Sequence, residues 1–244
     1  MATVVLTDAK IYLAQFDISG DLNKVTVKQT PALLEDTAFG ATYHTNKPGL
    51  QKGEVHAEGY TQFGSGVTTI DGRLISKFAV ADTPVAVAAE GGDVGEAAYF
   101  MKSTMSSLVR GGVSVGELLK FQFDSMCSGA KGAMVRGTIM EDGKTARTTA
   151  SNTATQTLGA VSATQRMFAQ LHLTAFSGTD VTFTVKSAVT DFATITQRAA
   201  FTQNTAVGSE SLAPVDGAIT DTFWRIYWTG TFTSFNAVVL IGIQ

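Results

Sequence analysis

The feature that most constrains this chain is a two-residue alternation of apolar and polar side chains, repeated in short runs. The clearest run, Glu54–Tyr60, sends alternate residues to opposite sides, with Val55, Ala57 and Gly59 on one and Glu54, His56 and Glu58 on the other. Val25–Lys28 alternates in the same way. This period is typical of a β-strand with one buried face, because helical side chains repeat every ~3.6 residues. The sequence therefore predicts a mainly β protein.

The composition favours β-structure with neutral outer faces. Only 16% of the 244 residues are charged, whereas the chain has 24 glycines and many threonines. Hydrophobic residues make up 44% of the chain, enough for one large core or two modest ones. The 18 basic and 21 acidic residues give a formal net charge of −3, whereas a protein that grips nucleic-acid phosphates usually has a basic excess. The charge therefore argues against tight nucleic-acid binding.

Neither the single cysteine nor the N-terminal segment indicates a disulfide, a catalytic nucleophile or a targeting signal. Cys127 can form no intrachain disulfide, and its alternating neighbours predict a small buried residue rather than a nucleophile. The N-terminal run MATVVLTDAK lacks the basic segment and the long apolar stretch of a signal peptide. No apolar stretch approaches the ~18 residues that cross a bilayer. We therefore expect neither a signal peptide nor a membrane-spanning helix.

Two further patterns predict a helix and a hairpin. Apolar side chains recur at helical spacing from residue 67 to residue 78, at Val67, Ile70, Leu74, Ile75 and Phe78. Two later segments, 117–127 and 133–140, alternate as strands and are separated by the glycine-containing run 128–132. We expect these two segments to pair as a hairpin, with Phe121 and Phe123 inward on the first arm and Val135 and Ile139 inward on the second.

A change of composition predicts a domain boundary. Residues 141–160 are polar and threonine-rich and contain few large apolar side chains, which is typical of a connecting segment. Several short strand patterns at near-regular spacing follow it. We therefore expect a first β domain over residues 1–148, a linker over 149–157 and a β-sandwich domain over 158–244. The linker should be cut by proteases near Lys144 or Arg147.

A search for catalytic or metal-binding motifs finds no zinc-protease, paired-cysteine, nucleophile-elbow or phosphate-loop spacing. The densest group of ionisable residues is Glu54, His56 and Glu58 on one strand face, which could bind zinc. A solvated strand face is the simpler interpretation, because no second ligand cluster accompanies it. We expect no enzyme, no cofactor and no metal site.

The C-terminal aromatic residues raise the question of carbohydrate binding. Trp224 and Trp228, with Tyr227, could stack against sugar rings. The two tryptophans also share one face of a predicted strand with Ile226, and that face is more simply a core face.

The N-terminal part of the chain carries an ordered pattern that begins with DISGDLNKVTVKQTPALLEDTAFG and continues with NKPGLQKGEVHAEGYTQFG. Its elements are a turn, an acidic pair, a nearby glycine, a Pro-Gly-Leu motif and an alternating strand, at Asp17–Leu22, Glu35–Thr37, Gly40, Pro48–Leu50 and Val55–Tyr60. Together these elements resemble the N-terminal region of major tail proteins of long-tailed bacteriophages, and the resemblance covers about residues 9–140. The C-terminal part resembles the added β domains of phage tail proteins.

The resemblance implies a tail-tube-like β-barrel or sandwich domain with one helix, followed by a second β-sandwich domain. It implies a virion structural protein that forms stacked, hexameric rings, makes a conduit for DNA, contacts other tail proteins and is synthesised in the host cytoplasm. DNA would pass through without specific binding, and no membrane partner is implied. The alternatives are a head-decoration or baseplate protein and a carbohydrate-binding module for host adsorption.

The tail-tube interpretation assigns two groups of residues. In a closed barrel, one strand face meets the core and the other meets the lumen or solvent. We expect the lumen to be lined by the polar residues of the alternating strand and the hairpin, namely Glu54, His56, Glu58, Lys120, Asp124 and Arg136. The acidic residues would repel DNA, and Asp124 or neighbouring carboxylates would neutralise Lys120 and Arg136. We expect the segment between Leu33 and Gly49 to be an assembly loop, with Glu35, Asp36, Phe39, Tyr43 and Pro48 as its contact residues.

Overall fold

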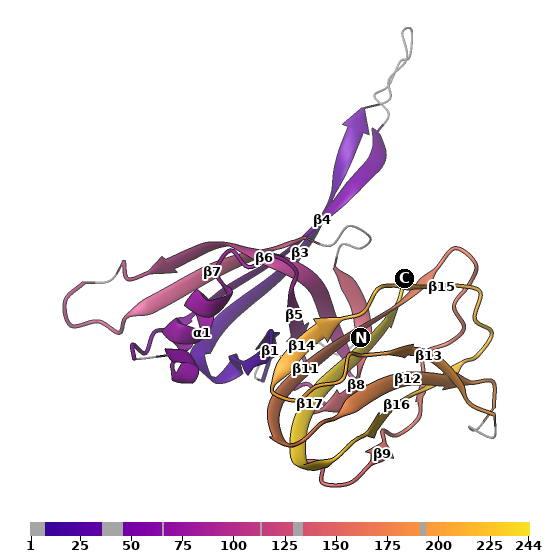
Figure 1. The fold of residues 1–244 in the computed structure, drawn as a ribbon. Helices are drawn as coiled ribbons and strands as arrows, with labels where there is room; N and C mark the ends of the chain where they lie inside the picture. Colours follow the sequence, from indigo (N-terminus) through magenta and orange to yellow (C-terminus); the bar gives the residue numbers. More distant parts are fainter. Residues whose placement is uncertain (1–7, 36–45, 65, 113, 129–133, 191–193) are drawn as a thin grey trace, which may run out of the picture. The chain divides into compact units, whose positions relative to one another are not determined.

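The computed structural model describes residues 8–35, 46–64, 66–112, 114–128, 134–190 and 194–244. The chain forms two compact units (Figure 1). The sandwich unit comprises Met1–Asp21, Thr83–Lys102 and Val135–Gln244, and the helix unit comprises Leu22–Asp82 and Ser103–Met134. The structure is rich in strands and contains one α-helix among the described residues, so the predicted mainly β class is confirmed.

The first sheet of the sandwich unit is built from segments that are far apart in the sequence. Its order runs β14-β11-β17-β8-β6-β5-β1-β2, and β15 pairs with β11. The strands are β1 (Lys10–Leu13), β2 (Phe16–Asp17), β5 (Thr83–Ala88), the first part of β6 (Ala97–Arg110), β8 (Val135–Asp142), β11 (Arg166–Gly178), β14 (Gly208–Ser211), β15 (Val215–Asp216) and β17 (Phe232–Ile243). A 3-10 turn at Ser19–Asp21 follows β2, where the sequence predicted a turn.

The second sheet of the sandwich unit has the order β10-β16-β12-β13, and β9 also pairs with β16. Its strands are β9 (Ser151–Asn152), β10 (Gln156–Thr157), β12 (Thr182–Ala188), β13 (Thr196–Ala200) and β16 (Phe223–Thr229). Side chains from both sheets share one core, because Phe183 and Trp228 of the second sheet each pack edge to face on Phe235 of the first, with ring centroids 5.2 and 5.7 Å apart.

Among the described residues, the helix unit contains four strands in the order β3-β4-β7-β6. They are β3 (Leu22–Glu35), β4 (Asn46–Tyr60), β7 (Lys120–Cys127) and the part of β6 that begins at Ser103. Because β7 pairs with β4 only from Glu54 to Tyr60, the outer half of β4 pairs with β3 alone among the described strands. Figure 1 shows this outer half as a long two-stranded arm.

The predicted helix is present but is shorter and less buried than its pattern suggested. A 3-10 turn (Gly66–Thr68) leads into α1 (Ile70–Lys77), which buries only Ile70 and Leu74. Val67, Ile75 and Phe78 are about half exposed instead of joining the buried stripe. The ion pair between Arg110 and Asp71 (2.5 Å) ties α1 to β6.

The predicted hairpin between residues 117–127 and 133–140 is wrong, although both segments form strands. β7 pairs with β4 and with the second half of β6, whereas β8 pairs with the first half of β6 and with β17. β6 is long enough to offer separate stretches to both strands, so each finds a partner that is distant in the sequence. The expected turn at 128–132 falls mostly outside the described residues. Cys127, which ends β7, is half-buried rather than buried.

The compact units do not follow the boundary predicted at residues 149–157. β8 lies before that boundary, yet it pairs with β17 at the C-terminus. The predicted linker contains β9 and β10, which both pair with β16. Threonine-rich segments lack large apolar residues, but their backbones can still complete a sheet. Composition alone therefore placed the boundary inside the sandwich unit.

Candidate functional site

The polar face of the helix unit is created by the alternation of β4. Val55 and Ala57 are 1% and 0% exposed, whereas Glu54, His56 and Glu58 on the opposite face are partly exposed. This confirms the alternation predicted for this strand. One face of β4 therefore belongs to the core and the other presents three ionisable side chains.

Neighbouring strands extend this polar face sideways. His56 lies between Thr26 of β3 and Asp124 of β7, which are its direct cross-strand partners. Glu58 likewise lies opposite Lys24 of β3 and Gln122 of β7. Directly opposite side chains on one face are close enough to interact.

The centre of the face is a chain of charged contacts. The His56 ring lies 2.7 Å (Nδ1) from Asp124 Oδ1 and 2.9 Å (Nε2) from Glu58 Oε1. Lys24 Nζ donates to the same Glu58 oxygen at 2.6 Å. The hydrogen bond to Glu58, and to a smaller extent the one to Asp124, raises the pKa of His56. The hydrogen bond from Lys24, and to a smaller extent the one from His56, lowers the pKa of Glu58. These four residues are called the His56 cluster below.

The structure places five of the six predicted lumen residues on two paired strands of the helix unit. Glu54, His56 and Glu58 lie on β4, and Lys120 and Asp124 lie on β7. Arg136 lies on β8 in the sandwich unit, because the predicted hairpin does not form. Asp124 contacts His56, whereas its expected partners were Lys120 and Arg136.

The acidic stripe expected on this face is largely neutralised by neighbouring cations. Lys52 approaches Glu54 at 3.5 Å, and Lys24 contacts Glu58. The face therefore carries interleaved positive and negative groups rather than a continuous negative field. These pairs weaken the repulsion of DNA that the acidic stripe was expected to exert.

Part of the predicted assembly loop is strand. Glu35 ends β3 and pairs with Asn46, and Pro48 of β4 lies opposite Leu33. The two strands therefore continue further into the predicted loop than their weak periodicity indicated. The other predicted contact residues, Asp36, Phe39 and Tyr43, lie outside the described residues.

Exposed apolar side chains are a feature of the helix unit that the sequence patterns did not predict. They are Leu33, Leu34, Leu50, Tyr60, Phe63, Val67, Ile75, Phe78, Val80, Val109, Val115 and Leu118, called the apolar surface below. The adjacent pair Leu33-Leu34 was a usable signal, because consecutive strand residues point to opposite faces and the polar residues around this pair do not indicate a strand buried on both faces. Both are more than half exposed.

The two tryptophans are core residues. Trp224 and Trp228 are 0% and 2% exposed, and their indole nitrogens donate to the carbonyl oxygens of Gly159 and Thr149. Their rings are therefore not available to stack on a sugar, which removes the platform considered for carbohydrate binding. Tyr227, on the opposite face of β16, is partly exposed and lies under the Lys186 ammonium group at 4.3 Å.

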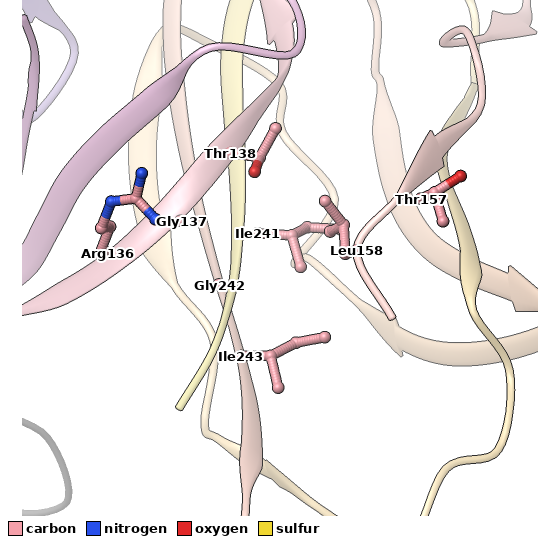
Figure 2. Close-up of a pocket in the computed structure, with 8 residues that line it drawn as sticks. All are labelled: Arg136, Gly137, Thr138, Thr157, Leu158, Ile241, Gly242 and Ile243. Carbon is pink, nitrogen blue, oxygen red and sulfur yellow. The ribbon is translucent and has the colours of Figure 1, made fainter. Parts of the chain in front are cut away.

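A pocket of about 230 Å³ lies in the sandwich unit between β8, β17 and the segment after β10. Its lining residues are Arg136, Gly137, Thr138, Thr157, Leu158, Ile241, Gly242 and Ile243. Figure 2 shows Arg136 standing apart from the side chains of Leu158, Ile241 and Ile243. The lining holds one ionisable group and no acid–base pair, so it offers no recognisable catalytic arrangement.

Metal and membrane features are also not seen in the part of the chain that the structure describes. No cluster of three or more His, Cys, Asp or Glu side chains there is arranged to hold a metal ion. No helix among these residues has the length and apolar character needed to cross a bilayer.

The sequence matches no protein-family model and no curated protein. Solved structures do show similarity. A chain of the sheath–tube complex of the extracellular contractile injection system PVC is 10% identical with a TM-score of 0.43, over 56% of this chain and 92% of that chain. The SPP1 tail tube is 10% identical with a TM-score of 0.40, over 53% of this chain and 76% of that chain. The Dit protein of SPP1, from the hub adsorption apparatus of phages that infect Gram-positive bacteria, is 11% identical with a TM-score of 0.39, over 98% of this chain and 100% of that chain. At TM-scores below 0.5, these similarities do not by themselves decide the function.

Proposed function

We propose that this chain is a structural subunit of a phage tail tube, which forms stacked, hexameric rings around a conduit for DNA. The observation that carries the proposal is β3, a 14-residue strand at the edge of the helix unit's sheet. The resemblance of residues 9–140 to major tail proteins supplies the specific architecture. The chain's own surfaces supply the physical reasons for self-assembly.

The edge formed by β3 is open to pairing with another subunit. β4 is the only strand that pairs with β3 among the described residues. Pro31 lies within β3, and proline is tolerated at an edge because it has no N–H to donate. A long edge strand is a template for another strand, and closure of a ring would satisfy it.

The apolar surface gives a second reason for association. In the described residues, 12 of the 15 large apolar side chains that are exposed lie in the helix unit. The surface includes Leu50 at 89% exposure and Leu118 at 71%. Exposed apolar groups at this density mark interaction surfaces, because their burial against a partner is favourable.

The polar face of β4 and β7 is proposed to line the channel. Its opposite face is already used by the core, so ring closure leaves this face toward the lumen or the solvent. Two of its cations, Lys24 and Lys52, are engaged by carboxylates, which reduces the positive charge that faces the proposed channel. A wall with little net positive charge would hold DNA phosphates weakly and let the DNA slide.

Electron microscopy of the purified chain tests the proposal. We expect tubes with a central channel. Changing both Leu33→Lys and Leu34→Lys should abolish the tubes while leaving a folded monomer, because both side chains are exposed and the change adds charge to the arm. The matched control is Val189→Lys with Val207→Lys, two exposed apolar residues of the sandwich unit, which should leave the tubes intact.

Two outcomes would defeat the proposal. One is a wild-type chain that remains monomeric at millimolar concentration. The other is gold labelling of virions at the head or at the baseplate alone, which would favour the decoration or baseplate alternative over a tube subunit.

A further inference from the structure

The geometry of the His56 cluster calls for a proton on each ring nitrogen of His56. Both ring nitrogens of His56 lie within 2.9 Å of a carboxylate oxygen, one from Asp124 and one from Glu58. An ionised carboxylate only accepts hydrogen bonds. A neutral imidazole has one N–H and one lone pair, so it can satisfy one carboxylate and must repel the other. Only the doubly protonated ring satisfies both contacts.

The ring joins three strands. Asp124 connects His56 of β4 to β7, and Glu58 passes the contact on to Lys24 of β3. Because Glu58 is two residues from His56 on the same strand, the link to β3 is indirect. The cluster therefore connects the edge strand β3, through β4, to the interior of the sheet.

The charges around the ring favour its protonation. The ionisable groups on the same face are Lys24 and Lys28 on β3, Lys52, Glu54 and Glu58 on β4, and Lys120 and Asp124 on β7. On β6, the residue opposite Asp124 is the uncharged Ser107. Glu58 and Asp124 are the groups in direct contact with the ring. The protonated cluster has two positive and two negative groups, and loss of the proton leaves one uncompensated negative charge.

We propose that His56 is a proton-dependent clasp that holds the register of β3, β4 and β7, so that loss of its ring proton opens one contact and weakens the pairing of β3 with a second copy of the chain. The clasp follows from the geometry within one subunit. Its effect on association rests on the tail-tube assembly proposed above.

The clasp has a defined pH dependence. The carboxylates raise the pKa of His56 above its ordinary value of 6.5. A group whose folded pKa is raised stabilises the folded state fully below pH 6.5 and loses that contribution as the pH rises through its folded pKa. The clasp should therefore be closed at pH 6 and open at alkaline pH.

A histidine-ring NMR titration of the full chain, at a concentration where it is monomeric, tests the clasp. We expect His56 to titrate above 6.5. Asp124→Asn and Glu58→Gln should each lower its midpoint, and Lys24→Gln should raise it by removing a nearby cation. Lys28→Gln is the matched control, because Lys28 lies opposite Glu54 and should change the midpoint least. A midpoint at or below 6.5, or one that Asp124→Asn leaves in place, overturns the clasp.

Sedimentation velocity at pH 6 and pH 8.5 tests its effect on assembly. Partly exposed ion pairs are weak, so we expect wild-type association to be about two- to fivefold weaker at pH 8.5. His56→Gln should remove that difference. Equal association of the wild type at both pH values overturns the link to assembly. A wild type that is monomeric throughout defeats the tube proposal instead, and the ring titration still decides the clasp.

Discussion

The two units treat their apolar side chains in opposite ways. The sandwich unit buries most of its apolar side chains, and Trp224, Phe183 and Leu171 are fully buried in the core shared by its two sheets. The helix unit buries the inner face of its sheet, including Phe123 and Val55, but leaves the apolar surface exposed. One unit buries its apolar groups internally, whereas the other has a long edge strand and exposed apolar groups, the features on which the proposed association rests.

Their histidines differ in the same way. His172 of the sandwich unit is 0% exposed, and its Nδ1 donates to the carbonyl oxygen of Ala14 at 2.5 Å. Burial lowers its pKa to about 4. His56 of the helix unit is partly exposed among carboxylates, and its pKa is raised. Both rings face two acceptors, but those of His172, the Ala14 carbonyl and the Gln170 amide oxygen at 3.0 Å, are uncharged, whereas those of His56 are carboxylates. Burial beside uncharged groups lowers the pKa of a histidine, and neighbouring carboxylates raise it.

The largest expected effect comes from the core of the sandwich unit. Trp228→Ala should lower the free energy of unfolding by about 3–5 kcal/mol, through a cavity and the loss of the hydrogen bond to Thr149. Leu50→Ala in the helix unit is the comparison, and should change it by less than ~0.5 kcal/mol, because Leu50 is 89% exposed. Chemical denaturation of both variants measures the difference. Equal losses would contradict the distinction between a unit that buries its apolar groups and one that exposes them.

Acid should weaken the sandwich unit through His172. The folded pKa of about 4 lies below the ordinary 6.5, so the unfolded chain binds the proton first as the pH falls. Stability should therefore decline between pH 6.5 and 4, by up to about 3 kcal/mol. His172→Gln should flatten this decline in unfolding experiments across that range. An unchanged decline in the variant would assign the acid sensitivity to other groups.

Proteolysis should cut at different rates after Lys144 and after Arg147, two neighbouring sites between which the sequence made no distinction. The backbone of Arg147 exchanges two hydrogen bonds with Phe235, and its guanidinium holds the buried carboxylate of Glu141 through two more. Lys144 has an exposed side chain that pairs with Asp93. We expect trypsin to cut after Lys144 well before Arg147, as measured by mass spectrometry of early fragments. Cleavage at Arg147 first would show that this segment opens as a linker.

Local patterns in the sequence predicted much of the fold but not its long-range pairing. Alternation identified the polar and buried faces of β4, because the two-residue period is a property of the strand itself. It could not show that β8 pairs with β17, since strand partners depend on contacts across the whole chain. The face holding Glu54, His56 and Glu58 was therefore predictable, whereas the position of Arg136 was not. The partner of His56 was equally hidden, because Asp124 is 68 residues away.

The smallest expected effect on stability, and a direct test of the polar face, is Glu54→Lys. Glu54 makes one long contact, 3.5 Å to Lys52, and it is not part of the His56 cluster. The change should alter the free energy of unfolding by less than ~0.5 kcal/mol and leave tubes intact under the electron microscope. If the face lines the channel, two adjacent lysines should then hold DNA phosphates and slow DNA release, and added salt should reverse the effect because phosphate contacts release counterions. Glu54→Gln, which removes the charge without reversing it, should slow release less. Normal release from the lysine variant, together with labelling of a His56→Cys variant from outside intact tubes, would place this face on the outer surface.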